Sequence, residues 1–202
     1  MRALFLVLAL LLSACPPTLS RSRSPAFDAR LAHAERDAHH GRDGDAATGF
    51  GEAAELAERR VDRDEARYRQ TRALIDAGEE AEALEILDAI AAAQPPSRRT
   101  ARALFDAAKL RAGQSDSAAA ETGFLRVVRH HPESGIAGRA LHWLLRGQPP
   151  QSVLTRLASL DSEVGATSLG DDILMRMHDA HVELQNPAAA RQDLERLVER
   201  HP

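Results

Sequence analysis

The sequence contains few of the residue types on which several kinds of binding site depend. Its 202 residues include one cysteine, and aromatic side chains make up 3% of the chain. One cysteine cannot form a disulfide bond within the chain, so packing alone has to stabilise the fold. The scarcity of aromatic residues argues against a stacking platform for sugars or bases. A formal net charge of −4 argues against nucleic acid as a partner, because nucleic-acid sites need a basic patch.

Patterns typical of β-strands and of catalytic sites are missing as well. No stretch alternates apolar and polar residues with β-branched side chains. Alanine, leucine, glutamate and arginine, which favour helix, dominate the composition. The sequence lacks a Gly-x-Ser-x-Gly nucleophile motif, a phosphate-binding loop and a His-Glu-x-x-His metal motif. We therefore expect an all-α protein that is not an enzyme and that holds no cofactor.

The N-terminus has the organisation of an export signal. Met1-Arg2 provides a charged start, residues 3–12 form an apolar run, and small residues precede Cys15. The run is too short for a membrane-spanning helix, which needs about 20 residues, but it suits a signal that is removed. The segment Leu12-Ser13-Ala14-Cys15 resembles the lipobox of bacterial lipoproteins. The resemblance implies a signal peptide at residues 1–14 and acylation, as with palmitate, at Cys15. The alternative is a buried cysteine beside an apolar N-terminal segment.

Residues 15–26 are expected to connect this lipid anchor to the folded body as a flexible tether. The segment from Pro16 to Ala26 is rich in proline, serine and arginine, which leave little to bury. Fully extended, it would hold the body about 30 Å from a membrane. Pro16 stands where lipoproteins retained in the inner membrane of enteric bacteria carry aspartate. We therefore expect a lipoprotein that faces the periplasm, with the outer membrane favoured over the inner membrane.

A repeating pattern of small, apolar and proline residues covers most of the remaining chain. Ala83, Leu87 and Ile90 lie four and three residues apart, which places them on one helical face between Gly78 and Pro95. Alanine allows a paired helix to approach closely, a large side chain fills the space one turn later, and proline ends the helix. The offsets recur at Gly41, Ala46, Phe50 and Ala53; at Ala120, Phe124, Val127 and Pro132; and at Ala190, Leu194, Leu197 and Pro202.

This pattern resembles the tetratricopeptide (TPR) repeat, a helix–turn–helix unit of about 34 residues. The resemblance implies an all-α, TPR-like solenoid of about five units and about ten helices over residues 27–202. A generic amphipathic bundle would explain the helices but not the regular return of proline and alanine. The expected units are residues 27–60, 61–97, 98–132, 133–166 and 167–202.

The fourth unit and the end of the fifth unit depart from the pattern. Residues 133–166 carry Pro149-Pro150 at the expected turn and have no closing proline, so the register of this unit stays open. The sequence stops at His201-Pro202, where a further helix would normally cover the last unit. We expect either different packing of the last helix pair or a domain truncated at its C-terminus, and we favour truncation.

Two segments, residues 124–134 and 190–202, are similar to repeats in envelope proteins of Gram-negative bacteria. Examples are the lipoprotein partner of the outer-membrane β-barrel assembly machine and the periplasmic coordinator of the Tol–Pal system. The resemblance implies a lipid-anchored adaptor that binds a protein or peptide partner during envelope assembly. The assembly lipoprotein has regular tyrosines that this sequence lacks. An accessory TPR domain of a secretion or pilus component is an alternative.

Partner contacts in such a scaffold are expected from the first helix of each unit. Candidates are polar or aromatic residues that lie off the predicted core stripe. Trp143 is the strongest of them, because it is the only tryptophan and follows a helix otherwise filled by leucine. The full set of groove candidates is Tyr68, Arg72, Lys109, His142, Trp143 and Arg146.

Nine histidines raise the alternative of a metal- or small-ligand-binding lipoprotein. His178 and His181 lie three residues apart on an expected helix, so two ligands could share a metal ion. Zinc sites normally need three or four ligands, and both histidines fall on or beside the packing face. We interpret them as histidines of the core or its edge, and we predict no metal site.

Overall fold

The structure, a computed structural model, describes residues 23–200. Within that range there are ten α-helices and no strand, and none of the helices is long and apolar enough to cross a membrane. The predicted signal peptide, Cys15 and most of the tether lie outside the described residues. The helices are α2 (Pro25–His39), α3 (Asp43–Leu56), α4 (Arg60–Asp76), α5 (Glu80–Ala92), α6 (Thr100–Gly113), α7 (Ser117–His130), α8 (Ala137–Leu145), α9 (Pro150–Val164), α10 (Gly170–Glu183) and α11 (Pro187–Arg200).

The first helix begins earlier than the sequence suggests. We expected the tether to extend through Ala26, but α2 starts at Pro25. Proline is favoured at the first helical position because its missing N–H would have no partner there. The side chain of Ser24 accepts a hydrogen bond from the backbone N–H of Phe27 at 3.1 Å and so caps the helix.

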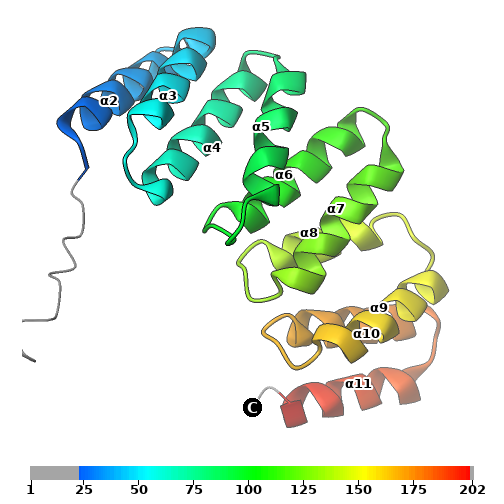
Figure 1. Cartoon of the computed structure of the whole chain (residues 1–202). Coiled ribbons are helices and arrows are strands. Elements are labelled where there is room, and N and C mark those ends of the chain that lie inside the picture. Colours follow the sequence, from blue (N-terminus) through cyan, green and yellow to red (C-terminus); the bar gives the residue numbers. More distant parts are fainter. Residues whose placement is uncertain (1–22, 201–202) are drawn as a thin grey trace, which may run out of the picture.

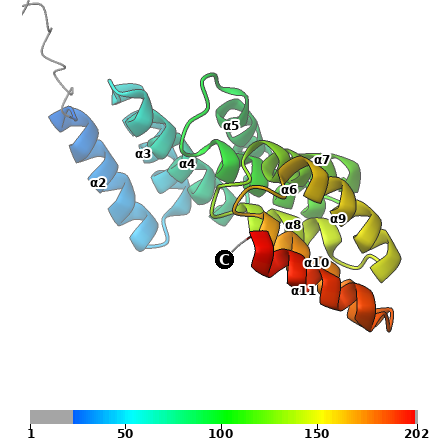
Figure 2. The ribbon, with the colours of Figure 1, turned by 90° about the horizontal axis from the view of Figure 1, so that it is seen from below.

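The ten helices form five antiparallel pairs that stack into an elongated, curved array (Figures 1 and 2). The pairs coincide with the five units expected from the sequence, and we number them as units 1 to 5 from α2–α3 to α10–α11. The prediction of an all-α, TPR-like solenoid is therefore confirmed. Units 1 and 5 lie at opposite ends of the array (Figure 1).

Four of the five units join their two helices by the same turn. One residue takes a positive φ, and the N–H of the residue after it bonds to a carbonyl five residues earlier, as in a Schellman cap. In unit 2, Gly78 has a φ of 83° and the N–H of Glu79 donates to the carbonyl of Leu74 at 2.8 Å. The positive-φ residues of the other three units are Gly41 (70°), Ser115 (66°) and Gln185 (57°).

Unit 4 turns differently, as its sequence led us to expect. Helix α8 has 9 residues, whereas α6 and α10 have 14 each. It ends in a type II turn, with Gly147 at a φ of 72° and the N–H of Gln148 donating to the carbonyl of Leu145 at 3.1 Å. Pro150 then opens α9. The equivalent second-helix residues of units 3 and 4 therefore lie 33 residues apart, whereas they lie 37 apart in the other neighbouring units.

Three equivalent residues of each unit face the next unit, and we call them the boundary positions. The first boundary position lies on the first helix of a unit, and the other two lie on the second helix. In units 1 to 5 the first position holds Leu31, Tyr68, Phe105, His142 and Met175. The second holds Phe50, Leu87, Phe124, Leu157 and Leu194. The third holds Ala54, Ala91, Val128, Asp161 and Val198. In units 1 to 3 all nine are buried.

Small residues set the distance between the two helices of units 1 and 3. A Cβ atom added at Gly49 of α3 would lie 2.8 Å from the Cβ of Ala34 on α2. One added at Gly123 of α7 would lie 2.8 Å from the Cβ of Ala108 on α6. Backbones this close leave no room for a side chain. The close approach that alanine was expected to allow is therefore present, with glycine on the second helix.

Candidate functional site

Hydrogen bonds between side chains connect the first helices of units 1 to 3. The hydroxyl of Tyr68 on α4 donates to Asp106 Oδ2 on α6 at 2.7 Å, and Arg102 Nε donates to the same oxygen at 3.0 Å. The guanidinium of Arg99 lies 4.8 Å from the centre of the tyrosine ring. Burial and the hydrogen bond to the Asp106 carboxylate raise the pKa of Tyr68 to about 12.

Arginine–carboxylate pairs extend these connections back to unit 1. Arg69 Nε on α4 donates to Glu65 Oε1 at 2.9 Å, and Arg99 Nε donates to Glu65 Oε2 at 2.6 Å. Arg69 also pairs with Glu35 on α2. Burial disfavours the charged form of Glu65, but hydrogen bonds from the two arginines together hold its pKa below the usual range. These charged side chains therefore pair with one another and connect neighbouring units.

A cleft opens on the same side of the array between α8 and α10, where unit 4 meets unit 5. His142 occupies the first boundary position there, in place of the leucine, tyrosine and phenylalanine of units 1 to 3, and it is exposed. The missing last turn of α8 widens the gap. The cleft has a volume of about 220 Å³. Its lining comes from His142 and Leu145 on α8; from Arg146 and Gln148 in the turn after it; from Pro150 and Val153 on α9; and from Arg176, Asp179, Ala180 and Glu183 on α10.

Charged groups of both signs surround an apolar part of this cleft. Four charged residues of the lining are exposed, and none forms an ion pair with another residue in the range 23–200: Arg146 in the turn after α8, and Arg176, Asp179 and Glu183 of α10. Their donors and acceptors are therefore free for a ligand. The cleft holds no hydroxyl or thiol beside a base, and the described part of the chain contains no cluster of three metal-ligating side chains. The arrangement suits binding.

The structure places only two of the six groove candidates, His142 and Arg146, in this cleft. Trp143 is half-buried: its ring stacks on Phe124 with centroids 5.5 Å apart and 18° between the planes. Arg146 lies over the outer side of that ring, 5.2 Å from its centre. Trp143 therefore contributes to the packing of unit 4 on unit 3.

The other three candidates lie on α4 and α6. Tyr68 was expected to lie off the core stripe, and this was wrong: it is 8% exposed and belongs to the core. Its partner Asp106 comes from the next unit, which the helical period of α4 alone does not reveal. Arg72 and Lys109 are exposed, and neither forms an ion pair within the described residues. Both lie outside the cleft.

Sequence reasoning missed the α10 side of the cleft. Arg176, Asp179 and Glu183 are spaced three and four residues apart, so they share one helical face. That spacing was a usable signal, but the sequence analysis considered only His178 and His181 on this helix. The spacing alone does not show that this face lines a cleft, because the cleft also depends on the shortness of α8.

The two histidines of α10 form hydrogen bonds to α11, the other helix of their unit. His181 Nδ1 lies 2.7 Å from Asp193 Oδ2 on α11, and His178 Nδ1 lies 3.0 Å from the carbonyl oxygen of Ala190. Both are half-buried, and Asp193 is buried. The interpretation of His178 and His181 as histidines at the edge of the core is confirmed.

Comparisons with known proteins agree with the fold. No protein-family model matches the chain, and no curated protein matches it. A crystal structure of a single-residue variant of nearly identical TPR-like repeats, from a Podosopora anserina protein named for the kinesin light chain, matches at 16% identity with a TM-score of 0.50. The match covers 86% of this chain and 93% of that one. Another structure of the same repeats has 15% identity and a TM-score of 0.49, with 86% and 94% covered. The first likeness shows a TPR-like fold.

Proposed function

We propose that this protein is a non-catalytic scaffold that holds a protein or peptide segment in the cleft between α8 and α10. The observation that carries the proposal is that the first boundary position, which buried Leu31, Tyr68 and Phe105 fill in units 1 to 3, holds the exposed His142 where this cleft opens. Its volume is below the range of about 300–1,000 Å³ typical of sites for drug-sized ligands. It therefore suits one or two side chains of a peptide better than a whole small molecule.

The charges of the cleft indicate the kind of segment that it would accept. Arg146 and Arg176 offer guanidinium donors, while Asp179 and Glu183 offer carboxylates, around the apolar side chains of α8 and α9. A segment with one apolar residue flanked by an acidic and a basic residue would satisfy all of these groups. Exposed charges of both signs contribute more to specificity and association rate than to affinity.

The second part of the proposal concerns location. The pattern at residues 1–15 supports export, acylation at Cys15 and attachment to a membrane on its periplasmic side, with the outer membrane favoured. The likeness of residues 124–134 and 190–202 to repeats of envelope adaptors supports a role in envelope assembly. These statements depend on the sequence pattern, and they are independent of the cleft.

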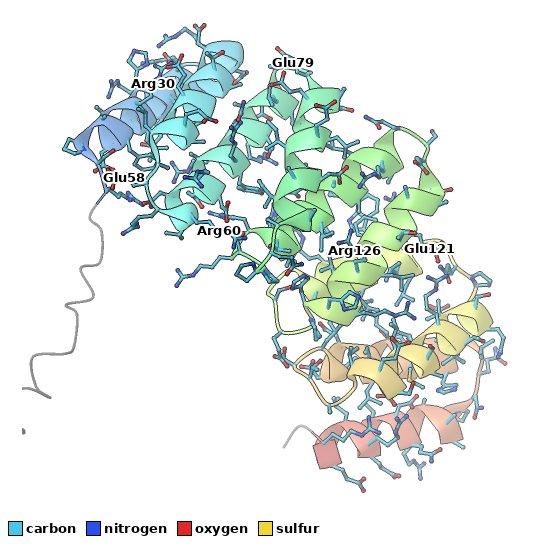
Figure 3. The ribbon with its side chains drawn as sticks, viewed as in Figure 1. Arg30, Glu58, Arg60, Glu79, Glu121 and Arg126 are labelled. Carbon is cyan, nitrogen blue, oxygen red and sulfur yellow. The ribbon has the colours of Figure 1, made fainter. Side chains whose placement is uncertain are left out.

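Crosslinking in cells tests the cleft directly. A photoreactive amino acid in place of Arg146 is expected to capture a partner, whereas one in place of Lys109, exposed on α6 outside the cleft, is not. The Arg176→Glu substitution should reduce the captured amount at least tenfold, and Arg126→Glu, on the exposed part of α7 (Figure 3), should not. Equal capture from positions 146 and 109 would contradict binding in the cleft.

Cell fractionation tests the anchor separately. If Cys15 carries the lipid, Cys15→Ser moves the protein from the membrane fraction to the soluble fraction while the helical content stays unchanged. A membrane-bound Cys15→Ser protein would contradict the anchor and leave the cleft proposal in place.

A further inference from the structure

The face of unit 5 that points away from unit 4 carries apolar residues at all three boundary positions. We call Met175, Leu194 and Val198 the end face. Their exposed fractions are 41%, 37% and 70%. The equivalent residues of unit 3, which are Phe105, Phe124 and Val128, are 0%, 3% and 0% exposed. The same positions are thus core residues in one unit and surface residues in the other.

The contact of unit 4 with unit 3 shows which side chains cover a face of this kind. On α8, Trp143 stacks on Phe124 with centroids 5.5 Å apart, and the guanidinium of Arg139 lies 5.2 Å from the centre of the Phe105 ring. A helix that contributes apolar or aromatic side chains therefore covers the equivalent face. Nothing within residues 23–200 covers the end face in this way.

Exposure by itself does not account for apolar residues at these positions. Where unit 4 meets unit 5, the chain places His142 and Asp161 at the first and third boundary positions, and these positions are partly solvated. The repeat therefore accommodates polar residues at such positions. Unit 5 returns to methionine and valine, although its third position is the most exposed of the five.

The other end of the array offers no apolar surface that could cover the end face. The large apolar side chains exposed in residues 23–200 are Leu56 and Val61 near the junction of α3 and α4, and five in unit 5. None lies on α2, whose exposed side chains include His33 and Arg36. Head-to-tail stacking of unit 1 on unit 5 would therefore bury the end face against polar groups.

Within the described chain, the apolar surface that suits the end face is the end face of a second copy. A two-fold axis brings the same patch of two copies together, so apolar residues meet apolar residues. Arg191 and Glu195 flank Leu194 on α11, and both are exposed without an ion pair among the described residues. Antiparallel α11 helices related by a two-fold axis can set these opposite charges against each other. We propose that two copies of this chain associate through the end face.

The mass in solution tests this association. The chain from residue 15 onward, with Cys15→Ser to prevent acylation, is expected to form dimers in sedimentation experiments at about 0.1 mM, a concentration that reveals weak association. Val198→Glu is expected to weaken the dimer at least tenfold. Val61→Glu is the matched control, because Val61 is 48% exposed and lies outside the end face. Circular dichroism of each variant verifies the helical content.

Disulfide crosslinking tests whether the two copies meet through the end face. In the Cys15→Ser background the chain has no other cysteine, so Val198→Cys should form disulfide-linked dimers on mild oxidation and Val61→Cys should not. A monomeric parent at 0.1 mM would overturn the proposal. A dimer that survives Val198→Glu, or that crosslinks through position 61 only, would overturn it as well.

Discussion

The contacts between units differ between the two halves of the array. From unit 1 to unit 4, each unit meets the next through three buried residues, and the side chains at the third position are Ala54, Ala91 and Val128. Between units 4 and 5 that position holds Asp161, which pairs with Arg196 and, at 2.8 Å, with Arg200 of α11. Burial of apolar area stabilises by about 25 cal/mol per Å², whereas an exposed ion pair contributes about 0–1 kcal/mol. The third position of the last boundary is therefore joined by ion pairs in place of apolar contact, although Leu157 at its second position is buried.

The ion pairs between units change sides at the same place. In units 1 to 3 some of them connect first helices, as between Glu35 on α2 and Arg69 on α4. Others connect a first helix to the second helix of the preceding unit, as between Arg111 on α6 and Asp88 on α5. Arg60, at the start of α4, also reaches the carbonyl of Pro95 in the loop before α6 (Figure 3). From α7 onward they connect second helices, as between Glu121 and Arg156 at 2.6 Å. The side that carries the cleft is thus the side that the ion pairs of the second half leave open.

The largest effect is expected from shortening one residue at the second boundary position in two different units. Phe124→Ala in unit 3 should lower the free energy of unfolding by about 3–5 kcal/mol, because it leaves a cavity between units. Leu194→Ala in unit 5 should lower it by about 1 kcal/mol or less, because Leu194 is 37% exposed. Urea denaturation in dilute solution measures both. Equal losses would show that the end face is not a free surface in the monomer.

The next effect is expected from high pH, at which Tyr68 on the first-helix side of the array loses its proton. Tyr68 is the only tyrosine, so absorbance near 295 nm follows this one group. Its pKa is about 12 in the folded chain and about 10 when unfolded. The stabilisation by the neutral hydroxyl is therefore fully present below pH 10 and is lost as the pH rises through 12. A shift of two pKa units corresponds to about 2.7 kcal/mol.

Tyr68→Phe provides the control for that titration. Phenylalanine occupies the equivalent position in unit 3, at Phe105, so the ring is expected to fit. The variant should lose the step in stability between pH 10 and 12 and keep the remaining pH dependence. A folded-state titration of Tyr68 near pH 10 would contradict the hydrogen bond to Asp106.

A smaller change is expected from making the polar boundary resemble the apolar ones. His142→Phe introduces at unit 4 the residue type of Phe105, so the ring should cover part of the cleft and raise the free energy of unfolding by about 1 kcal/mol. The same change should reduce crosslinking of a partner from position 146. Increased stability with undiminished crosslinking would separate the cleft from binding.

The parts of the structure that depend on local sequence could be predicted, and the cleft could not. Glycine, alanine and proline at fixed offsets located units 1, 2, 3 and 5, because turns, close helix contacts and helix ends are set by neighbouring residues. The register of unit 4 stayed open, since its turn differs. The cleft depends on the loss of the last turn of α8 and on residues of α10 that follow about 30 positions later. Tyr68 was misplaced for a similar reason, since Asp106 lies 38 residues away. Periodicity within one helix carries no information about such partners.

The smallest effect is expected at Asp161, and it distinguishes the two kinds of boundary most directly. Asp161→Val gives unit 4 the residue type of Val128 and removes the pairs with Arg196 and Arg200, whose side chains are 28% and 43% exposed. The Asp161 carboxylate is 11% exposed, but the partly exposed arginines keep each pair at about 1 kcal/mol and sensitive to salt, so the loss and the gain in apolar contact should nearly cancel. The free energy of unfolding should change by less than about 1 kcal/mol, and it should become less sensitive to sodium chloride.

Glu163→Gln, which removes the α7–α9 pair with Arg129, should reduce the salt dependence without adding apolar contact. A loss of several kcal/mol from Asp161→Val would mean that the pair is effectively buried and that units 4 and 5 are joined as firmly as the others.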